Sequence, residues 1–201
     1  MTSLPPTRLP AAARRQALVE AGLRVFEGGS YSGSTTADIA REAGVSEPIL
    51  YRHFASKREL YFACVDEAWA RLRRAFEAKI EEFGPERAVF AIGAVVAGLK
   101  SKRTLVPNLW IQAITEAGED PEIRRYLRGH LREVHDFVAD LVRCTQAAGG
   151  VPADRDPDAE AWVFIGGALL VAVADRLGGM LGHDDFAAIA AARQRWLTGD
   201  L

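Results

Sequence analysis

Residues 35–57, which read TTADIAREAGVSEPILYRHFASK, predict two short helices joined by a tight turn and followed by the start of a third helix. Thr35 or Thr36 can cap the first helix, since a threonine hydroxyl accepts a hydrogen bond from a backbone N–H at a helix start. Gly44 falls where the chain must turn, because glycine adopts a positive φ without a Cβ clash. Pro48 lies in the first turn of the second helix, where its missing N–H costs nothing. This layout is that of a helix-turn-helix, whose second helix enters the major groove of DNA.

The second of these helices has two different faces. Leu50 and Phe54 are four residues apart and are therefore predicted to face the core together. Pro48, Ile49 and Arg52 fall on the opposite side and are left for a partner. An outward isoleucine and arginine suit a helix that reads a DNA groove, because arginine hydrogen-bonds guanine and an apolar group contacts the methyl group of thymine.

The extended segment TTADIAREAGVSEPILYRHFASKREL resembles the DNA-binding segment of TetR-family transcriptional regulators. The motif T-x-x-I-A-x-x-A-G-V-S is followed by L-Y-x-H-F and then by S-K-x-x-L, in order and without gaps, and the resemblance covers residues 18–60. It implies an all-helical homodimer with a variable C-terminal domain that binds a small effector. At the matching positions it also implies that Tyr51, His53 and Lys57, together with Thr36, contact phosphates.

Base reading is expected from Ile49 and Arg52, with Glu47 as an acceptor for a cytosine amine. Many relatives carry lysine or another residue where Glu47 stands, so an acidic side chain and a proline replace part of the family's pattern here. The predicted DNA contacts are Thr36, Glu47, Pro48, Ile49, Tyr51, Arg52, His53 and Lys57.

Charge is distributed unevenly along the 201 residues. Residues 1–58 carry eight basic and five acidic side chains, a net charge of +3, whereas the remainder carries 17 basic and 22 acidic side chains, a net charge of −5. The apolar share of 49% and the charged share of 26% are typical of soluble globular proteins. A basic N-terminal part on an acidic body suits a protein that presents one end to DNA.

Three features predict a soluble cytoplasmic protein. Cys64 and Cys144 have no metal-ligand spacing and are expected to be reduced. The first ten residues contain no apolar stretch of the kind found in signal peptides. The longest apolar run, residues 161–174, has 14 residues, fewer than the roughly 20 that span a bilayer. No membrane partner is expected.

Helical periodicity and turn signals predict an all-α fold of about nine helices. Residues 1–10 are expected to be a disordered tail, residues 11–58 the helix-turn-helix DNA-binding head, and residues 59–201 a helical ligand-binding and dimerisation domain. The helices outside the motif are expected at about 11–27, 56–82, 104–117, 121–148, 156–177 and 184–197, with a further helix that follows the break at Gly84-Pro85 and extends to about residue 100. The long helix at 56–82 would link the head mechanically to the body.

Residues 162–174, WVFIGGALLVAVA, are apolar around the whole helix and must be buried on more than one side. Gly166 and Gly167 would let another helix approach closely. The resemblance implies dimerisation through the last two long helices as a four-helix bundle, although a monomer core would explain the same residues. The predicted dimer interface comprises Trp162, Ile165, Gly166, Leu169, Val173, Ile189 and Trp196.

A small-molecule site needs an apolar cavity with a few polar groups. The aromatic residues of the predicted helices in the body could line such a cavity for a small apolar or amphipathic effector, or they could be plain core. The predicted ligand-binding residues are Trp69, Phe76, Phe90, Trp110, Gln112, Tyr126, His130 and Phe137.

Enzymatic signals are weak. His130 and His135 are five residues apart, so they diverge on a helix and form no metal pair. The sequence has no Glu-x-x-His motif, no glycine-rich phosphate loop and no nucleophile elbow. No catalytic residue, metal or cofactor is therefore expected. The sequence predicts a dimeric DNA-binding repressor of a near-palindromic operator that a small effector releases. The alternatives are an all-α metalloprotein or enzyme with an incidental helix-turn-helix, and a constitutive DNA binder with a filled core.

Overall fold

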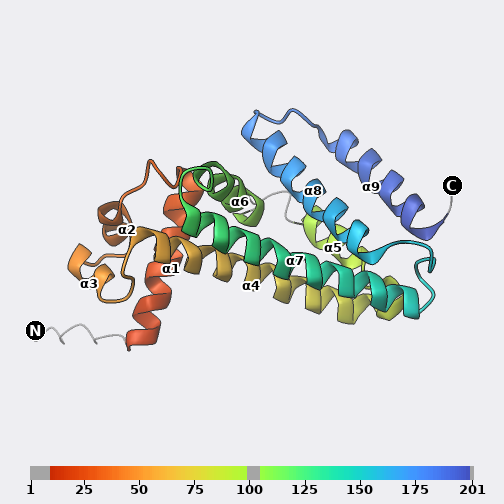
Figure 1. The fold of residues 1–201 in the computed structure, drawn as a ribbon, viewed down its shortest axis with the longest axis horizontal. Helices are drawn as coiled ribbons and strands as arrows, with labels where there is room; N and C mark the ends of the chain where they lie inside the picture. Colours follow the sequence, from red (N-terminus) through yellow and green to blue (C-terminus); the bar gives the residue numbers. More distant parts are fainter. Residues whose placement is uncertain (1–9, 99–104, 200–201) are drawn as a thin grey trace, which may run out of the picture. The chain divides into compact units, whose positions relative to one another are not determined.

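The computed structural model describes residues 10–98 and 105–199, and all regular elements within these ranges are helical (Figure 1). The predicted all-α fold is confirmed. The elements are α1 (Ala11–Gly28), α2 (Thr36–Glu42), α3 (Glu47–Tyr51), α4 (Lys57–Phe83), the 3-10 turn η1 (Pro85–Arg87), α5 (Phe90–Gly98), α6 (Leu105–Glu116), α7 (Pro121–Ala147), α8 (Pro157–Arg176) and α9 (His183–Thr198).

The chain forms two compact units that divide inside α4. The first unit ends at Ala68 and the second begins at Trp69. The predicted domain limits at residues 10 and 58 stay predictions. The predicted tail lies outside the described residues, apart from Pro10.

The core of the first unit is built where α1, α2, α3 and the start of α4 meet. Phe26 of α1 lies edge-on to Tyr61 of α4, with ring centroids 4.9 Å apart, and Tyr31 lies at the same distance from Tyr61. Leu50 and Phe54 are buried, as their four-residue spacing predicts. The helix-turn-helix is therefore fixed on an aromatic and aliphatic core.

A glycine sets how closely α1 approaches α4 in this unit. Gly22 is buried, and a Cβ added to it would lie 2.7 Å from Sγ of Cys64. That distance is too short for two unbonded atoms, so a larger residue would force the Cys64 side chain or the helices to shift. Cys64 also lies 3.5 Å from the carbonyl oxygen of Val19, to which its thiol donates a weak hydrogen bond.

In the second unit, α7 packs against α8, and α6 packs against both. Aspartates begin two of these helices, because a carboxylate accepts hydrogen bonds from the backbone N–H groups of a first turn. Asp120 accepts from Glu122 and Ile123 at the start of α7, and Asp156 caps α8 in the same way. A separate small core contains Val89, Val142, Val151 and Leu197, with Phe90 and Phe164 packed against it.

Candidate functional sites

The turn between α2 and α3 has the geometry that the sequence predicts. The hydroxyl of Thr35 accepts from the backbone N–H of Asp38, and the Asp38 carboxylate accepts from the backbone N–H of Thr35, each at 3.1 Å. The Thr35 hydroxyl also donates to the Asp38 carboxylate, at 2.6 Å. This bond, followed by those from the Thr35 backbone N–H and from Arg41, lowers the pKa of Asp38. Gly44 follows α2 with a φ of 67°. A capped α2 and a left-handed glycine therefore hold α3 at a fixed angle.

The surface of α3 is divided as its periodicity predicts. Leu50 is fully buried, whereas Pro48, Tyr51 and Arg52 are exposed and Ile49 is half-buried. Tyr51 keeps 49% of its surface accessible, a high fraction for a tyrosine in a compact unit. The outward residues are those that the sequence assigns to DNA.

Three of the predicted DNA contacts are joined to one another. The hydroxyl of Thr36 donates to the Glu47 carboxylate and lies 3.2 Å from the phenol oxygen of Tyr51. Thr36 is 8% exposed. These contacts connect the start of α2 to both ends of α3.

Lys57, at the start of α4, lies against the loop between α1 and α2. Its ammonium donates to the carbonyl oxygens of Tyr31 and Ser34, at 2.8 and 3.0 Å, and lies 4.3 Å from the centre of the Tyr31 ring. His53, which follows α3 and precedes Lys57 in the sequence, is half-buried. Lys57 therefore has a structural role in the first unit in addition to its predicted phosphate contact, which stays a prediction.

Comparisons with known proteins agree with this helix-turn-helix. The family described as "Bacterial regulatory proteins, tetR family" matches residues 18–64. The HTH-type transcriptional regulator BetI of Brucella canis is 30% identical over 137 residues, which are 67% of this chain and 69% of that protein. The chain belongs to the TetR family. It carries the DNA-binding helix-turn-helix of that family's transcriptional regulators.

Two further comparisons describe how far the TetR-family likeness extends. The BetI regulator of Agrobacterium fabrum is 35% identical over 132 residues, 65% of this chain, and the match spans 64% of that relative's length. A TetR-family regulator from Rhodococcus sp. has the same fold, with a TM-score of 0.78, 19% identity, and coverage of 93% of this chain and 99% of the other. The fold likeness therefore extends through both units, beyond the motif itself.

Six of the eight predicted ligand-binding residues form one aromatic cluster in the second unit. Trp69 and Phe76 of α4 contact Phe137 of α7, with ring centroids 5.5 and 6.1 Å from it. His130 lies 6.0 Å from Trp110 and 5.8 Å from Tyr126, ring to ring, and 6.4 Å from Trp69. We call Trp69, Phe76, Trp110, Tyr126, His130 and Phe137 the aromatic cluster.

The other two predicted ligand residues are placed differently. Gln112 is buried on α6. Phe90 packs instead against the small core around Val89 and Leu197. Among the described residues, the indole N–H of Trp110 is buried without a hydrogen-bond partner. The cluster therefore contains a polar group that a bound molecule could satisfy.

The predicted dimer residues lie on different sides of α8 and α9. Trp162, Val173, Ile189 and Trp196 are between 38% and 49% exposed. Gly166 is exposed, Leu169 is half-buried, and Ile165 is buried inside the protomer at 5% exposure. Further large apolar residues are exposed here, namely Val163, Leu170, Leu177 and Met180. We call Trp162, Val163, Gly166, Leu170, Val173, Leu177, Met180, Ile189 and Trp196 the α8–α9 surface.

In the described part of the chain, α8 is also the one helix long and apolar enough, by length and composition, to cross a membrane. Only 28% of its most apolar 18-residue stretch is buried in the protomer. The expectation from sequence counted only the uninterrupted run of 14 apolar residues, whereas the helix itself has 20.

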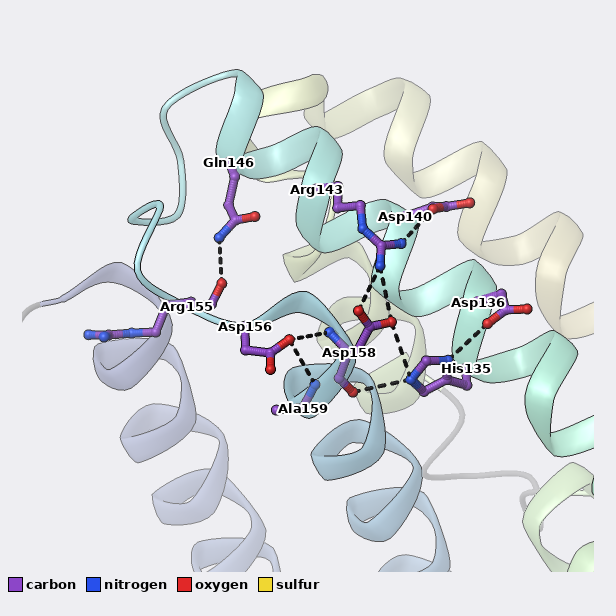
Figure 2. Close-up of polar contacts among 9 residues, drawn as sticks. All are labelled: His135, Asp136, Asp140, Arg143, Gln146, Arg155, Asp156, Asp158 and Ala159. Atoms are coloured by element: carbon purple, nitrogen blue, oxygen red, sulfur yellow. Dashed lines mark hydrogen bonds and ion pairs between the residues drawn. The ribbon is translucent and has the colours of Figure 1, made fainter.

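Figure 2 shows a polar cluster that fixes the start of α8 against α7. The guanidinium of Arg143 donates to both carboxylate oxygens of Asp158, at 3.0 and 2.9 Å. His135 contacts the carboxylate of Asp136 through Nδ1 at 2.9 Å and the carbonyl oxygen of Asp158 through Nε2 at 3.2 Å. The His135 ring also lies 4.5 Å from that of Trp162. The cluster therefore orients a tryptophan of the α8–α9 surface.

A second contact, between α8 and α9, was not anticipated from the sequence. Glu160 is buried and forms an ion pair with Arg193, while the indole N–H of Trp196 donates to the same carboxylate at 2.9 Å. Residues 160 and 196 are far apart in sequence, so helical periodicity could not find this pairing. A charged residue inside an apolar helix, such as Glu160, is the signal that a partner exists.

Proposed function

We propose that this TetR-family chain acts as a homodimeric repressor that binds a near-palindromic operator and is released by a small apolar or amphipathic effector. It would act in the cytoplasm, where its DNA is found. The observation that carries the proposal is the exposed side of α3, where Pro48, Arg52 and half of Tyr51 face outward from a capped helix-turn-helix.

A groove-reading role is supported by the chemistry of this side of α3. Arg52 is exposed, and an arginine can donate two hydrogen bonds to guanine in the major groove. Ile49, beside it, offers an apolar contact for a thymine methyl group. Base contacts specify a sequence, whereas contacts from Tyr51 and His53 to phosphates would fix the register.

Dimerisation is supported by two glycines in the middle of α8. Added Cβ atoms at Gly166 and Gly167 would meet nothing within 4 Å in the described structure. A glycine in a helix interior costs about 0.5–1 kcal/mol relative to alanine. Since packing within the chain does not require these glycines, close approach by a second helix explains them. The same approach would cover the exposed tryptophans and leucines of the α8–α9 surface.

Effector binding is supported by the aromatic cluster. It combines several rings with the buried indole N–H of Trp110, which would bond an acceptor on the effector. Two rings of the cluster, Trp69 and Phe76, belong to α4, and the same helix carries Lys57 and Leu60 in the first unit. An effector that separates these rings would shift α4 and alter the spacing of the two recognition helices. Only one spacing fits both half-sites, so operator affinity would fall.

DNA binding is tested by selecting an operator from a random duplex pool and measuring its affinity over a range of salt concentrations. We expect log K to fall steeply with log salt concentration. Arg52→Ala should cost about 1–3 kcal/mol on the operator and relax its specificity. The matched control is Arg128→Ala, an exposed arginine of α7 in the second unit, which should leave binding unchanged. The proposal is overturned if the wild-type chain shows no salt-dependent binding to DNA.

Effector release is tested separately. Compounds that raise the melting temperature would be titrated into the operator complex, with Trp69→Leu as the cluster variant. Release by a stabilising compound, weakened by Trp69→Leu, is the expected result. Tight binding of a compound with no change in operator affinity would favour a constitutive DNA binder. A reporter fused to the operator distinguishes repression from activation.

A further inference from the structure

The hydrogen bonds around Thr36 form a directed chain at the surface that is proposed to meet DNA. Thr36 donates its hydroxyl proton to the Glu47 carboxylate, which can only accept. A hydroxyl has a single proton to donate. The contact of 3.2 Å between Thr36 and Tyr51 therefore requires the Tyr51 phenol to donate to the Thr36 oxygen. The Thr36 proton is thus directed toward the chain's own carboxylate, and the Tyr51 proton toward the Thr36 oxygen.

This arrangement engages the two hydroxyl groups that are proposed to donate to DNA phosphates. A carboxylate and a phosphate are both anionic oxygen acceptors, and each forms short, strong hydrogen bonds with a hydroxyl. We propose that Glu47 is an internal competitor of the DNA backbone: it holds the Thr36 donor directly and the Tyr51 donor through Thr36, and so lowers affinity for every DNA sequence. The inference rests on the proposed function, because it concerns the same surface.

The positions of the three residues favour competition over a purely structural contact. Glu47 is half-buried and Tyr51 is 49% exposed, so a phosphate can reach the phenol. Thr36 lies between them at 8% exposure. When a phosphate accepts a hydrogen bond from the phenol, the carboxylate is left near a second anion. Like charges at such short range repel, and this repulsion adds to the cost of the exchange.

The variant Glu47→Gln removes the negative charge of residue 47 but keeps a side chain of nearly the same size and shape. Its amide oxygen can still accept from Thr36, so the contact between α2 and α3 is retained, but it is a weaker acceptor and carries no charge. Glu27→Gln is the matched control, because Glu27 is an exposed carboxylate of α1 in the same unit and its loss changes the net charge equally. Glu47→Ala serves as a second variant that also removes the carboxylate.

The experiment measures dissociation constants by fluorescence anisotropy for a mixed-sequence duplex and for the selected operator, at several salt concentrations. We expect Glu47→Gln to bind both duplexes about tenfold tighter at low salt. The salt slope should steepen by about one, since one negative charge facing the backbone is removed. Glu27→Gln should change either affinity by less than about twofold.

A double-mutant cycle with Tyr51→Phe tests whether the phenol is what Glu47 withholds. In the Tyr51→Phe background, the gain in affinity from Glu47→Gln should fall from about tenfold to about threefold, because the phenol donor is then missing. If Glu47→Gln raises DNA affinity as much with Tyr51→Phe as without it, charge alone acts and the inference is overturned. The inference is also overturned if Glu27→Gln raises the affinity as much as Glu47→Gln does. Circular dichroism and melting temperature establish that each variant is folded.

Two further outcomes separate this inference from the proposed function. Weaker operator binding by Glu47→Gln, with mixed-sequence binding unchanged, would make Glu47 a base-reading residue and overturn the inference alone. Failure of the wild-type chain to bind any duplex in a salt-dependent way would overturn the proposed function, and the inference would fall with it.

Discussion

Glu160 of α8 and Arg193 of α9 form an ion pair that joins the two helices of the α8–α9 surface. Glu160 is buried, and its carboxylate also accepts from the indole N–H of Trp196. Burial lowers the pKa of Arg193, but a guanidinium is not deprotonated in proteins and stays charged. The pair therefore fixes the relation of α8 to α9 before any partner approaches.

Replacing the arginine of this pair should lower the stability of the fold. Arg193→Leu leaves a buried carboxylate without its cation, and we expect a loss of about 3 kcal/mol in the free energy of unfolding. The double variant Glu160→Gln with Arg193→Leu removes both charges and keeps an acceptor for Trp196, so it should recover most of the loss. Urea denaturation at one fixed protein concentration measures both, since a dimer's stability depends on concentration.

The control for this prediction is the exposed pair between Arg143 and Asp140, whose atoms are 2.9 Å apart. Asp140→Ala should change stability by less than about 0.5 kcal/mol, because solvent screens such a pair. Equal losses in Arg193→Leu and Asp140→Ala would show that the Glu160 pair contributes no more than a surface contact.

The contact between Gly22 and Cys64 gives a prediction for the first unit. Gly22→Ala places a Cβ against Sγ of Cys64, and overpacking of this kind should cost about 1–3 kcal/mol. Adding Cys64→Ala removes the sulfur and should restore part of the loss, which thermal unfolding would detect. Gly129→Ala, at an open exposed position of α7, should instead stabilise by about 0.5–1 kcal/mol. A neutral Gly22→Ala variant would contradict the close approach of α1 and α4.

Local signals explain why the helix bounds were predictable from the sequence. Asp120 and Asp156 cap the helices that follow them, and Gly44 turns the chain with a positive φ. Each of these signals acts over a few residues. The burial of Leu50 and Phe54 was likewise predictable, because it needs only the helical period.

Contacts between distant segments were not predictable in this way. In a helix that is apolar all round, periodicity does not tell which side faces the chain's own core; the structure buries Ile165 and exposes Val163. Residue type alone places Phe90 with the other aromatic residues, but in the structure it packs against a different core. The carbonyl groups bound by Lys57 belong to residues 26 and 23 positions earlier.

Lys57 should therefore affect stability as well as DNA binding. Lys57→Ala removes two hydrogen bonds from an ammonium to the carbonyl oxygens of Tyr31 and Ser34, and we expect a loss of about 1–2 kcal/mol in unfolding free energy. It should also weaken binding to all DNA sequences alike and flatten the salt slope by about one. Lys79→Ala, which removes a solvent-accessible pair with Glu82 and a ring contact with Phe83 on α4, should cost about 0.5 kcal/mol or less. Unchanged stability of Lys57→Ala would mean that these bonds are replaced by water without loss.

Gly166 offers the sharpest test of the proposed dimer. Leucine at this position meets nothing within 4 Å of its Cβ inside the described protomer and favours the helix more than glycine does, so the protomer should fold at least as well. A partner helix packed on Gly166 would be displaced, and we expect the dimer dissociation constant, measured by sedimentation equilibrium, to rise by more than about tenfold.

Operator affinity should fall together with dimerisation in Gly166→Leu, because one recognition helix then binds its half-site without the other. Gly129→Leu makes the same chemical change at an exposed position of α7 and should leave both quantities unaltered. If Gly166→Leu remains a dimer of wild-type affinity, the copies must meet through another surface. In that case the exposed residues of α8 need a different partner, since an uncovered apolar helix of this length would favour aggregation.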